Sequence, residues 1–161
     1  MRKMDVFRWG VLLVMVLTTP AFSFDGVDIP EVRRLAEMGN PDAQSKLGVL
    51  NASGVGMEVN KKEAVKWYGK AAGQGYPLGQ WNLAFMYLRG EGGLQEDYAK
   101  ARELFQQAAD QGFAPAQYDL GMMYYHGVAV ESNRDEAEKW FRRAAGQGYR
   151  EAKKKLAELN K

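Results

Sequence analysis

The sequence predicts an all-α solenoid of antiparallel helix pairs, and two observations carry this prediction. From Glu31 onward the same pattern returns every 36 or 37 residues, a period typical of stacked two-helix units. Within each unit, two stretches with helical spacing are separated by a glycine-containing turn. The positions in register include Leu47, Leu83, Leu120 and Leu156, and also Gly39, Gly75, Gly112 and Gly148.

The first stretch of each unit has the spacing of an amphipathic helix. Ala43, Leu47 and Leu50 fall at offsets of 0, 4 and 7, which places them on one helical stripe. A proline stands at the opening of this helix in each unit, where its fixed φ is favourable. These prolines are Pro41, Pro77 and Pro115, and the glycines expected to end the helices are Gly54, Gly90 and Gly127.

The second stretch of each unit begins behind a short polar residue that can cap a helix, namely Asn60, Asp97 or Asn133. Large apolar residues then alternate with alanine, as expected for helices that pack closely against their neighbours. The buried face expected in the first unit is Ala64, Trp67, Tyr68, Ala71 and Ala72. Gly75, Gly112 and Gly148 are expected to end these helices in the left-handed conformation.

These signals set the predicted boundaries. The solenoid covers residues 31–161, with three full units at 43–78, 79–115 and 116–151. Residues 31–38 match only a second helix and residues 152–161 only a first helix. A terminal helix has no further neighbour and keeps one face in water, which agrees with the lysines at 153–155.

Residues 1–23 have the pattern of a secretory signal peptide. A basic start is followed by the apolar run 11–17 and by small residues at Ala21 and Ser23. An uncleaved anchor is the alternative, but the run is far shorter than the roughly 20 residues that span a bilayer. We therefore expect cleavage after Ser23, an exposed lead-in at 24–30 and no stable membrane insertion. The expected location is the periplasm of a Gram-negative bacterium or the secreted fraction.

Charge and cysteine content exclude several classes of function. Removing residues 1–23 takes three basic residues and one acidic residue from totals of 22 and 20, which leaves 19 of each. The mature chain is thus neutral, and no basic face predicts a nucleic-acid partner. The sequence contains no cysteine, so it has no disulfides, thiolate metal sites or thiol nucleophiles.

These residues resemble the Sel1-like repeat, a relative of the tetratricopeptide repeat. The resemblance rests on Ala43-x-x-x-Leu47-Gly48, Gly54-x-Gly56 and Ala64-x-x-Trp67-Tyr68-x-x-Ala71-Ala72-x-x-Gly75, which recur in later units. It implies a right-handed superhelix with a concave groove lined by the first helices. It also implies an adaptor that holds protein partners, and exported bacterial relatives commonly serve signalling, envelope regulation or host contact.

The side of the first helices opposite the leucine stripe carries the candidate binding residues. In the second and third units this side holds aromatic and methionine side chains, which concentrate binding energy and adapt to irregular partners. The candidates are Trp81, Phe85, Tyr118, Met122 and Tyr125, with Leu88 beside them. Packing between neighbouring first helices is the alternative. If Trp81 binds a partner, Trp81→Ala should weaken capture more than it lowers thermal stability.

No catalytic constellation is visible. His126 is the single histidine, which argues against a transition-metal site and favours an ordinary turn residue. No serine lies in a Ser-x-x-Lys or Gly-x-Ser-x-Gly motif, and the glycines at 90–93 lack the lysine of a phosphate loop. A cysteine-rich relative of the family is associated with β-lactam hydrolysis, but its disulfides are absent here. We expect no enzyme activity and no cofactor.

The sequence thus predicts an exported protein-interaction module that binds a protein or peptide partner in the groove. Two alternatives stay open. The solenoid could be a structural component of an envelope assembly without a groove ligand, or an enzyme acting on cell-wall or β-lactam substrates. Fold alone does not separate these possibilities, because function depends on the particular site.

Overall fold

The structure is a computed structural model that describes residues 27–159. Within that range the chain forms eight α-helices and no β-strand, which confirms the predicted all-α class. The helices are α3 (Ile29–Glu37), α4 (Pro41–Ser53), α5 (Lys61–Gly73), α6 (Pro77–Arg89), α7 (Tyr98–Asp110), α8 (Ala114–His126), α9 (Arg134–Gly146) and α10 (Arg150–Leu159).

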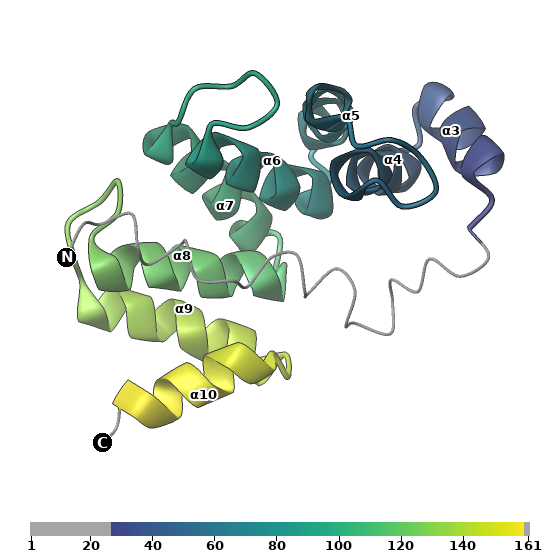
Figure 1. The fold of residues 1–161 in the computed structure, drawn as a ribbon. Coiled ribbons are helices and arrows are strands. Elements are labelled where there is room, and N and C mark those ends of the chain that lie inside the picture. The colour runs from purple at the N-terminus through teal and green to yellow at the C-terminus, as the bar shows by residue number, and fades with distance from the viewer. Residues whose placement is uncertain (1–26, 160–161) are drawn as a thin grey trace.

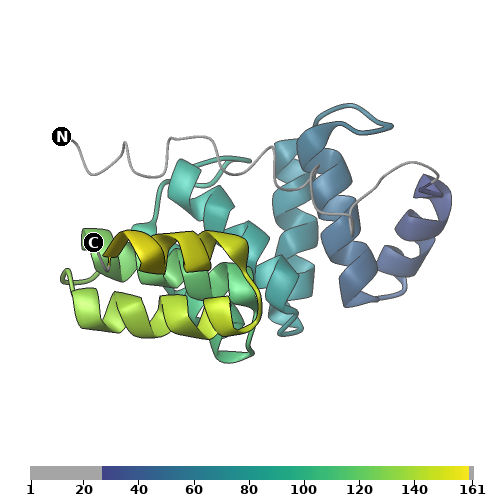
Figure 2. The same ribbon diagram turned by 90° about the horizontal axis from the view of Figure 1, so that it is seen from below.

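The helices stack in the order of the chain. Each first helix packs against the second helix of its own unit, which gives the pairs α4 with α5, α6 with α7 and α8 with α9. Each second helix also packs against the next first helix, so α5 contacts α6 and α7 contacts α8. The result is a curved stack with α3 at one end and α10 at the other (Figures 1 and 2). This is the α-solenoid that the repeat predicts.

The helix starts are where the polar residues predict them. Asn60, Asp97 and Asn133 each accept a hydrogen bond from the backbone N–H three residues on, at 3.1, 2.8 and 3.0 Å. Asn40 caps α4 in the same way, with a bond of 2.9 Å from Ala43 N. Each bond satisfies one of the backbone donors that a helix N-terminus leaves without a partner.

Left-handed residues close the first helices and shape the turns. Gly54, Gly90 and Gly127 end α4, α6 and α8 with φ of 75°, 61° and 66°. Two residues after Gly90, Gly92 passes close to the start of α5, and a Cβ there would lie 2.5 Å from the carbonyl oxygen of Lys61. Glycine is therefore required for this approach.

The N-terminal end differs slightly from the expectation. The expected lead-in extends to residue 30, whereas α3 already begins at Ile29. Asp28 caps this helix by accepting a hydrogen bond of 3.1 Å from Glu31 N, and Pro30 occupies its first turn. The predicted signal peptide and residues 24–26 of the lead-in lie outside the described residues, as do residues 160–161.

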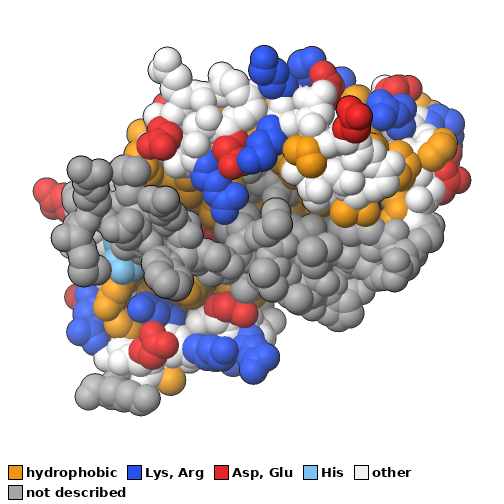
Figure 3. Space-filling model, in the orientation of Figure 1, with side chains coloured by type: hydrophobic (Ala, Val, Ile, Leu, Met, Phe, Trp, Pro, Cys, Tyr) orange, Lys and Arg blue, Asp and Glu red, His pale blue; other side chains and the backbone are white. Residues whose placement is uncertain are grey.

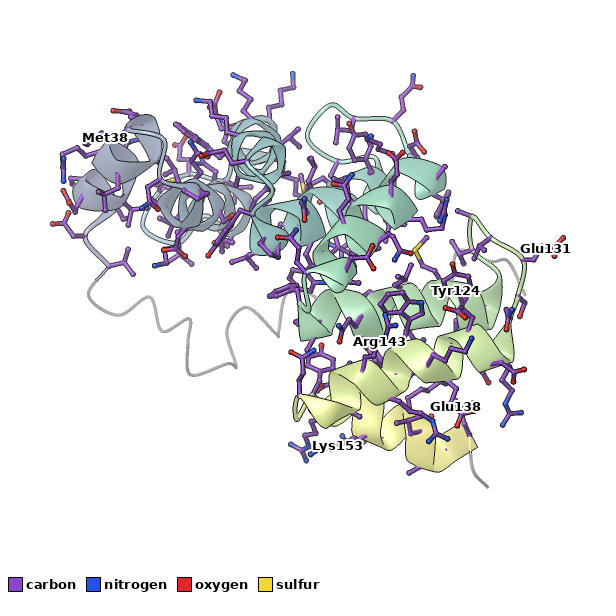
Figure 4. The ribbon with its side chains drawn as sticks, turned by 180° about the vertical axis from the view of Figure 1, so that it is seen from behind. Met38, Tyr124, Glu131, Glu138, Arg143 and Lys153 are labelled. Atoms are coloured by element: carbon purple, nitrogen blue, oxygen red, sulfur yellow. The ribbon has the colours of Figure 1, made fainter. Side chains whose placement is uncertain are left out.

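The core is continuous from unit to unit. Most alanines of the predicted second-helix faces are buried, whereas Ala72 and Ala145 are half-buried, and Phe105 and Phe141 are completely covered. Basic side chains shield the larger rings from outside: Lys70 lies 3.9 Å from the ring centre of Trp67, and Arg143, labelled in Figure 4, lies 4.4 Å from that of Trp140. Each unit thus completes its core only through its neighbours.

Candidate functional site

The first helices α6 and α8 carry the candidate site. Both are apolar around most of their circumference, whereas the second helices have a clear polar side. A helix that is apolar all round needs cover on every side, from its own fold or from a partner. The neighbour that covers each candidate residue therefore distinguishes packing within the fold from a surface left for a partner.

Trp81 and Phe85 are covered by the fold. Their exposed fractions are 7% and 5%. The two rings meet edge to face at a centroid distance of 5.0 Å, Trp81 also contacts Phe113 at 5.9 Å, and Phe85 contacts Phe105 at 5.0 Å. The indole therefore joins α6 to the start of α8, which is the packing role left open by the sequence. A part in partner binding stays a prediction for both residues.

Tyr118 and Met122 lie in the next unit and are half-buried. They contact the last hairpin. The Tyr118 ring lies 5.6 Å from Phe141 on α9 and 5.5 Å from Tyr149, the residue that precedes α10. Met122 belongs to the same apolar cluster, which includes Leu156 of α10. Both keep part of their surface accessible, and their role in binding also stays a prediction.

Tyr125 closes this row near the end of α8. It is half-buried, its ring meets His126 edge to face at 4.8 Å, and the Lys155 ammonium lies 4.4 Å from its centre. His126 is the last residue of α8, as the turn prediction implies. Desolvation and the nearby Lys155 charge lower the pKa of His126, so the imidazole is neutral at physiological pH.

Asp119, which no sequence pattern singles out, follows Tyr118 on α8. Its Oδ2 accepts a hydrogen bond of 2.7 Å from Nε1 of Trp81, so it ties α8 to α6 across a separation of 38 residues. Desolvation raises the pKa of Asp119 to about 7, and the Trp81 hydrogen bond lowers it by less. The residue retains partial solvent exposure. Periodicity could not reveal it, because no other unit has an acid at this position.

A second feature was missed although the sequence contained its signal. Glutamines recur in register on the first helices and behind the second helices, and each pair forms a hydrogen bond between consecutive helices. The pairs are Gln44 with Gln74 at 2.7 Å, Gln80 with Gln111 at 2.9 Å, and Gln117 with Gln147 at 2.8 Å. In two units the first-helix amide also bonds a backbone oxygen, Ala36 O or Ala109 O. This ladder satisfies polar groups buried within the stack.

The described residues offer no metal-binding cluster. Among residues 27–159, no three histidine, aspartate or glutamate side chains gather in a way that could hold a metal ion. No helix in this range is long and apolar enough to cross a bilayer. On the face drawn in Figure 3, basic and acidic side chains are interspersed. The expectations of no cofactor and no catalysis stay predictions.

The fold and its repeated contacts define a class, the two-helix-repeat solenoids that serve as protein-interaction modules. A family model for the Sel1 repeat matches residues 41–76, 77–113 and 114–149. The chain belongs to the Sel1 repeat family, which confirms the resemblance. Each matched unit lies two residues before the range set from the sequence, because the matched units begin at the first-helix starts at residues 41, 77 and 114.

Two curated proteins illustrate how widely such repeats occur. The chain is 36% identical over 128 residues to chitin synthase regulatory factor 3 of Schizosaccharomyces pombe, and this alignment covers 78% of the chain. The chain is also 38% identical over 68 residues to a sel1-like repeat-containing protein of Acanthamoeba polyphaga mimivirus, and this alignment covers 42% of the chain. The matched segments span only 14% and 13% of these longer relatives.

Solved structures give the same fold. A Sel1 repeat protein from Oxalobacter formigenes is 36% identical with a TM-score of 0.72, and the match covers 81% of this chain and 98% of that one. A protective antigen of uropathogenic Escherichia coli with an SLR fold is 36% identical with a TM-score of 0.71, covering 76% of this chain and 26% of that one. The cysteine rich protein B of Helicobacter pylori, at 22% identity and a TM-score of 0.61, covers 79% of this chain and 96% of that one and shares the fold alone.

Proposed function

We propose that this chain is an exported interaction module that holds a protein or peptide segment along its first helices. The observation that carries the proposal is the half-buried row of Tyr118, Met122 and Tyr125 on α8. These residues lie in the C-terminal half of the stack, and the terminal hairpin covers them only in part. Rigid aromatic rings beside an adaptable methionine are the composition of binding surfaces.

The relatives support the two halves of this proposal separately. One is named as a chitin synthase regulatory factor, and a regulatory role is compatible with an interaction module. Another is a protective antigen of a pathogenic bacterium, and such a protein is exposed to antibodies. The basic and apolar start of residues 1–23 supports export of this chain as well.

Site-specific photocrosslinking tests the binding surface. A photoreactive phenylalanine analogue replaces Tyr125 in one variant and Lys139 in the control; Lys139 is exposed on the second helix α9. Irradiation of cells should give a discrete crosslinked product from position 125 and none from position 139. Equal crosslinking from both positions, or from position 139 alone, would favour a structural component that uses its outer side.

Export has its own measurement. The mass of the protein purified from the envelope fraction should correspond to a chain that begins at Phe24. Leu13→Arg interrupts the apolar run and should leave the full-length chain in the cytoplasm. A full-length chain in the envelope would instead support the uncleaved anchor.

A further inference from the structure

When it is ionised, Asp119 is a partly buried carboxylate with no ion-pair partner among residues 27–159. Its Oδ2 accepts the hydrogen bond from Trp81, and none of the ion pairs formed within this range includes it. An indole N–H supplies a dipole but not a full positive charge. A partly buried carboxylate in this state gains from the arrival of a cation.

Three aromatic residues lie near this carboxylate, because Trp81 donates to it and its charge acts on Tyr118 and Tyr149. Trp81 holds one oxygen, and the rings of Tyr118 and Tyr149 meet 5.5 Å apart on the side toward α10. Desolvation and then the nearby Asp119 charge raise the pKa of Tyr118 to about 12, so this phenol stays neutral beside the acid. Aromatic faces attract ammonium and guanidinium groups, so the rings and the carboxylate favour the same type of ligand.

The repeat itself does not require an acid here. The positions in register with Asp119 hold Lys46, Asn82 and Lys155. Both lysines have partners within the chain: Lys46 forms an ion pair of 2.6 Å with Asp42, and Lys155 one of 3.6 Å with Glu158. Asp119 is thus a feature of the third unit alone, and no ion pair within the described part of the chain balances its charge.

We infer that Asp119 anchors a basic side chain, lysine or arginine, of the peptide segment that binds along the first helices. The inference rests on the proposed function and names the chemistry of its partner. The cation would donate to the carboxylate while Trp81 continues to hold Oδ2, and the rings of Tyr118 and Tyr149 would cover the aliphatic stem. Charge-assisted hydrogen bonds of this kind fix the register of a bound segment.

A peptide selection tests the inference even though the natural partner is unidentified. Random 12-residue peptides are displayed and selected on the purified protein, and their affinities are measured by titration calorimetry. Each basic residue of a selected peptide is then replaced by its neutral counterpart, norleucine for lysine and citrulline for arginine. One such replacement should weaken binding at least about 10-fold, because it removes a charge-assisted bond.

The matched protein variants are Asp119→Asn and Asp42→Asn. Asparagine at position 119 keeps an oxygen for the Trp81 N–H but removes the charge, whereas Asp42 is a more exposed acid on α4 that already has Lys46 as partner. Asp119→Asn should reproduce the 10-fold loss and should bind the neutral and basic peptides equally. Asp42→Asn should bind like the unaltered protein. The indole N–H resonance of Trp81 should shift on binding of the basic peptide.

The outcomes separate the inference from the proposed function. Some peptides could perturb the α6 and α8 resonances, contain no required basic residue and bind equally well to Asp119→Asn. That result would overturn the role of Asp119 as an anchor but would still support the interaction module. Peptides that map only to the second helices, or a selection that yields none, overturn both. If Asp119→Asn alters the circular dichroism spectrum, the peptide replacements on the unaltered protein decide the question.

Discussion

The junction between α4 and α6 and the junction between α6 and α8 use the same helix positions with side chains of opposite size. At the first junction, α4 presents Ser45 and Val49, and the two helices contact each other directly. At the second, Trp81 of α6 donates to Asp119 on α8, and Phe85 packs against Phe105 of α7. The Trp81 indole lies between α6 and α8, whereas small side chains let α4 and α6 approach closely.

This difference shows how a solenoid with a constant period can have a variable inner surface. The second helices and their capping residues repeat closely, so the units stack alike. The positions between first helices are free to vary in size, because each junction needs only local complementarity. The large residue between α6 and α8 is a tryptophan, whose indole N–H needs an acceptor. Asp119 accepts this hydrogen bond.

Making the second junction resemble the first should have the largest effect. Trp81→Ser removes a buried indole, creates a cavity and leaves Asp119 without its donor, so we expect a loss of about 4 kcal/mol in the free energy of unfolding. Urea denaturation followed by circular dichroism measures it. Trp81→Phe keeps most of the ring and should cost clearly less; equal losses would show that volume between the helices is unimportant. This stability cost also means that binding to Trp81→Ala must be compared at a temperature where the variant is folded.

The converse change tests the close approach of α4 and α6. Ser45 is completely buried, so Ser45→Leu introduces a side chain for which there is no space. Overpacking should lower the free energy of unfolding by about 2 kcal/mol. The measurement is the same urea titration, with Lys46→Leu as control, because Lys46 is only half-buried on the next position of α4. A neutral effect of Ser45→Leu would mean that the first junction can open like the second.

The charge at the second junction should make stability depend on pH. The folded state holds the Asp119 proton up to about pH 7, whereas an unfolded chain releases it near pH 4. The folded state therefore binds more protons between these values, and its stability falls as the pH rises from about 4 to 7. Asp119→Asn should remove this decline and stabilise the protein by about 1.5 kcal/mol at pH 8, since partial exposure weakens the effect. Melting curves from pH 4 to 8 measure the difference; a constant difference across this range would contradict the prediction.

The sequence predicted the fold well because the fold depends on local and repeated signals. Asn60, Asp97 and Asn133 cap helices as expected, since a capping bond spans only three residues. Gly75 and Gly148 adopt the left-handed conformation with φ of 76° and 91°, which follows from residue type at a helix end. The paired glutamines were equally periodic, and comparing polar as well as apolar positions would have found them.

The candidate site was less predictable because it depends on side-chain directions between units. The stripe containing Trp81 and Phe85 lies opposite the leucines, as expected, but helical spacing does not say whether a neighbouring helix or water covers it. Asp119 could not be predicted for another reason. It differs from Lys46 and Asn82 in the same register, so only the hydrogen bond to Trp81 singles it out.

The smallest predicted change in stability concerns the junction between α4 and α6. The hydroxyl oxygen of Ser45 is buried without a hydrogen-bond partner among the described residues, whereas the equivalent Trp81 N–H has Asp119. Ser45→Ala removes an unsatisfied polar group, keeps the small volume and improves helix propensity, so it should raise the free energy of unfolding by about 0.5–1 kcal/mol. Urea denaturation at two protein concentrations measures the gain, with Ser53→Ala as control, because the Ser53 hydroxyl donates to Val49 O at 2.8 Å. A loss of stability in Ser45→Ala would indicate that this hydroxyl has a hydrogen-bond partner in solution. The first junction, like the second, would then contain a hydrogen-bonded polar group.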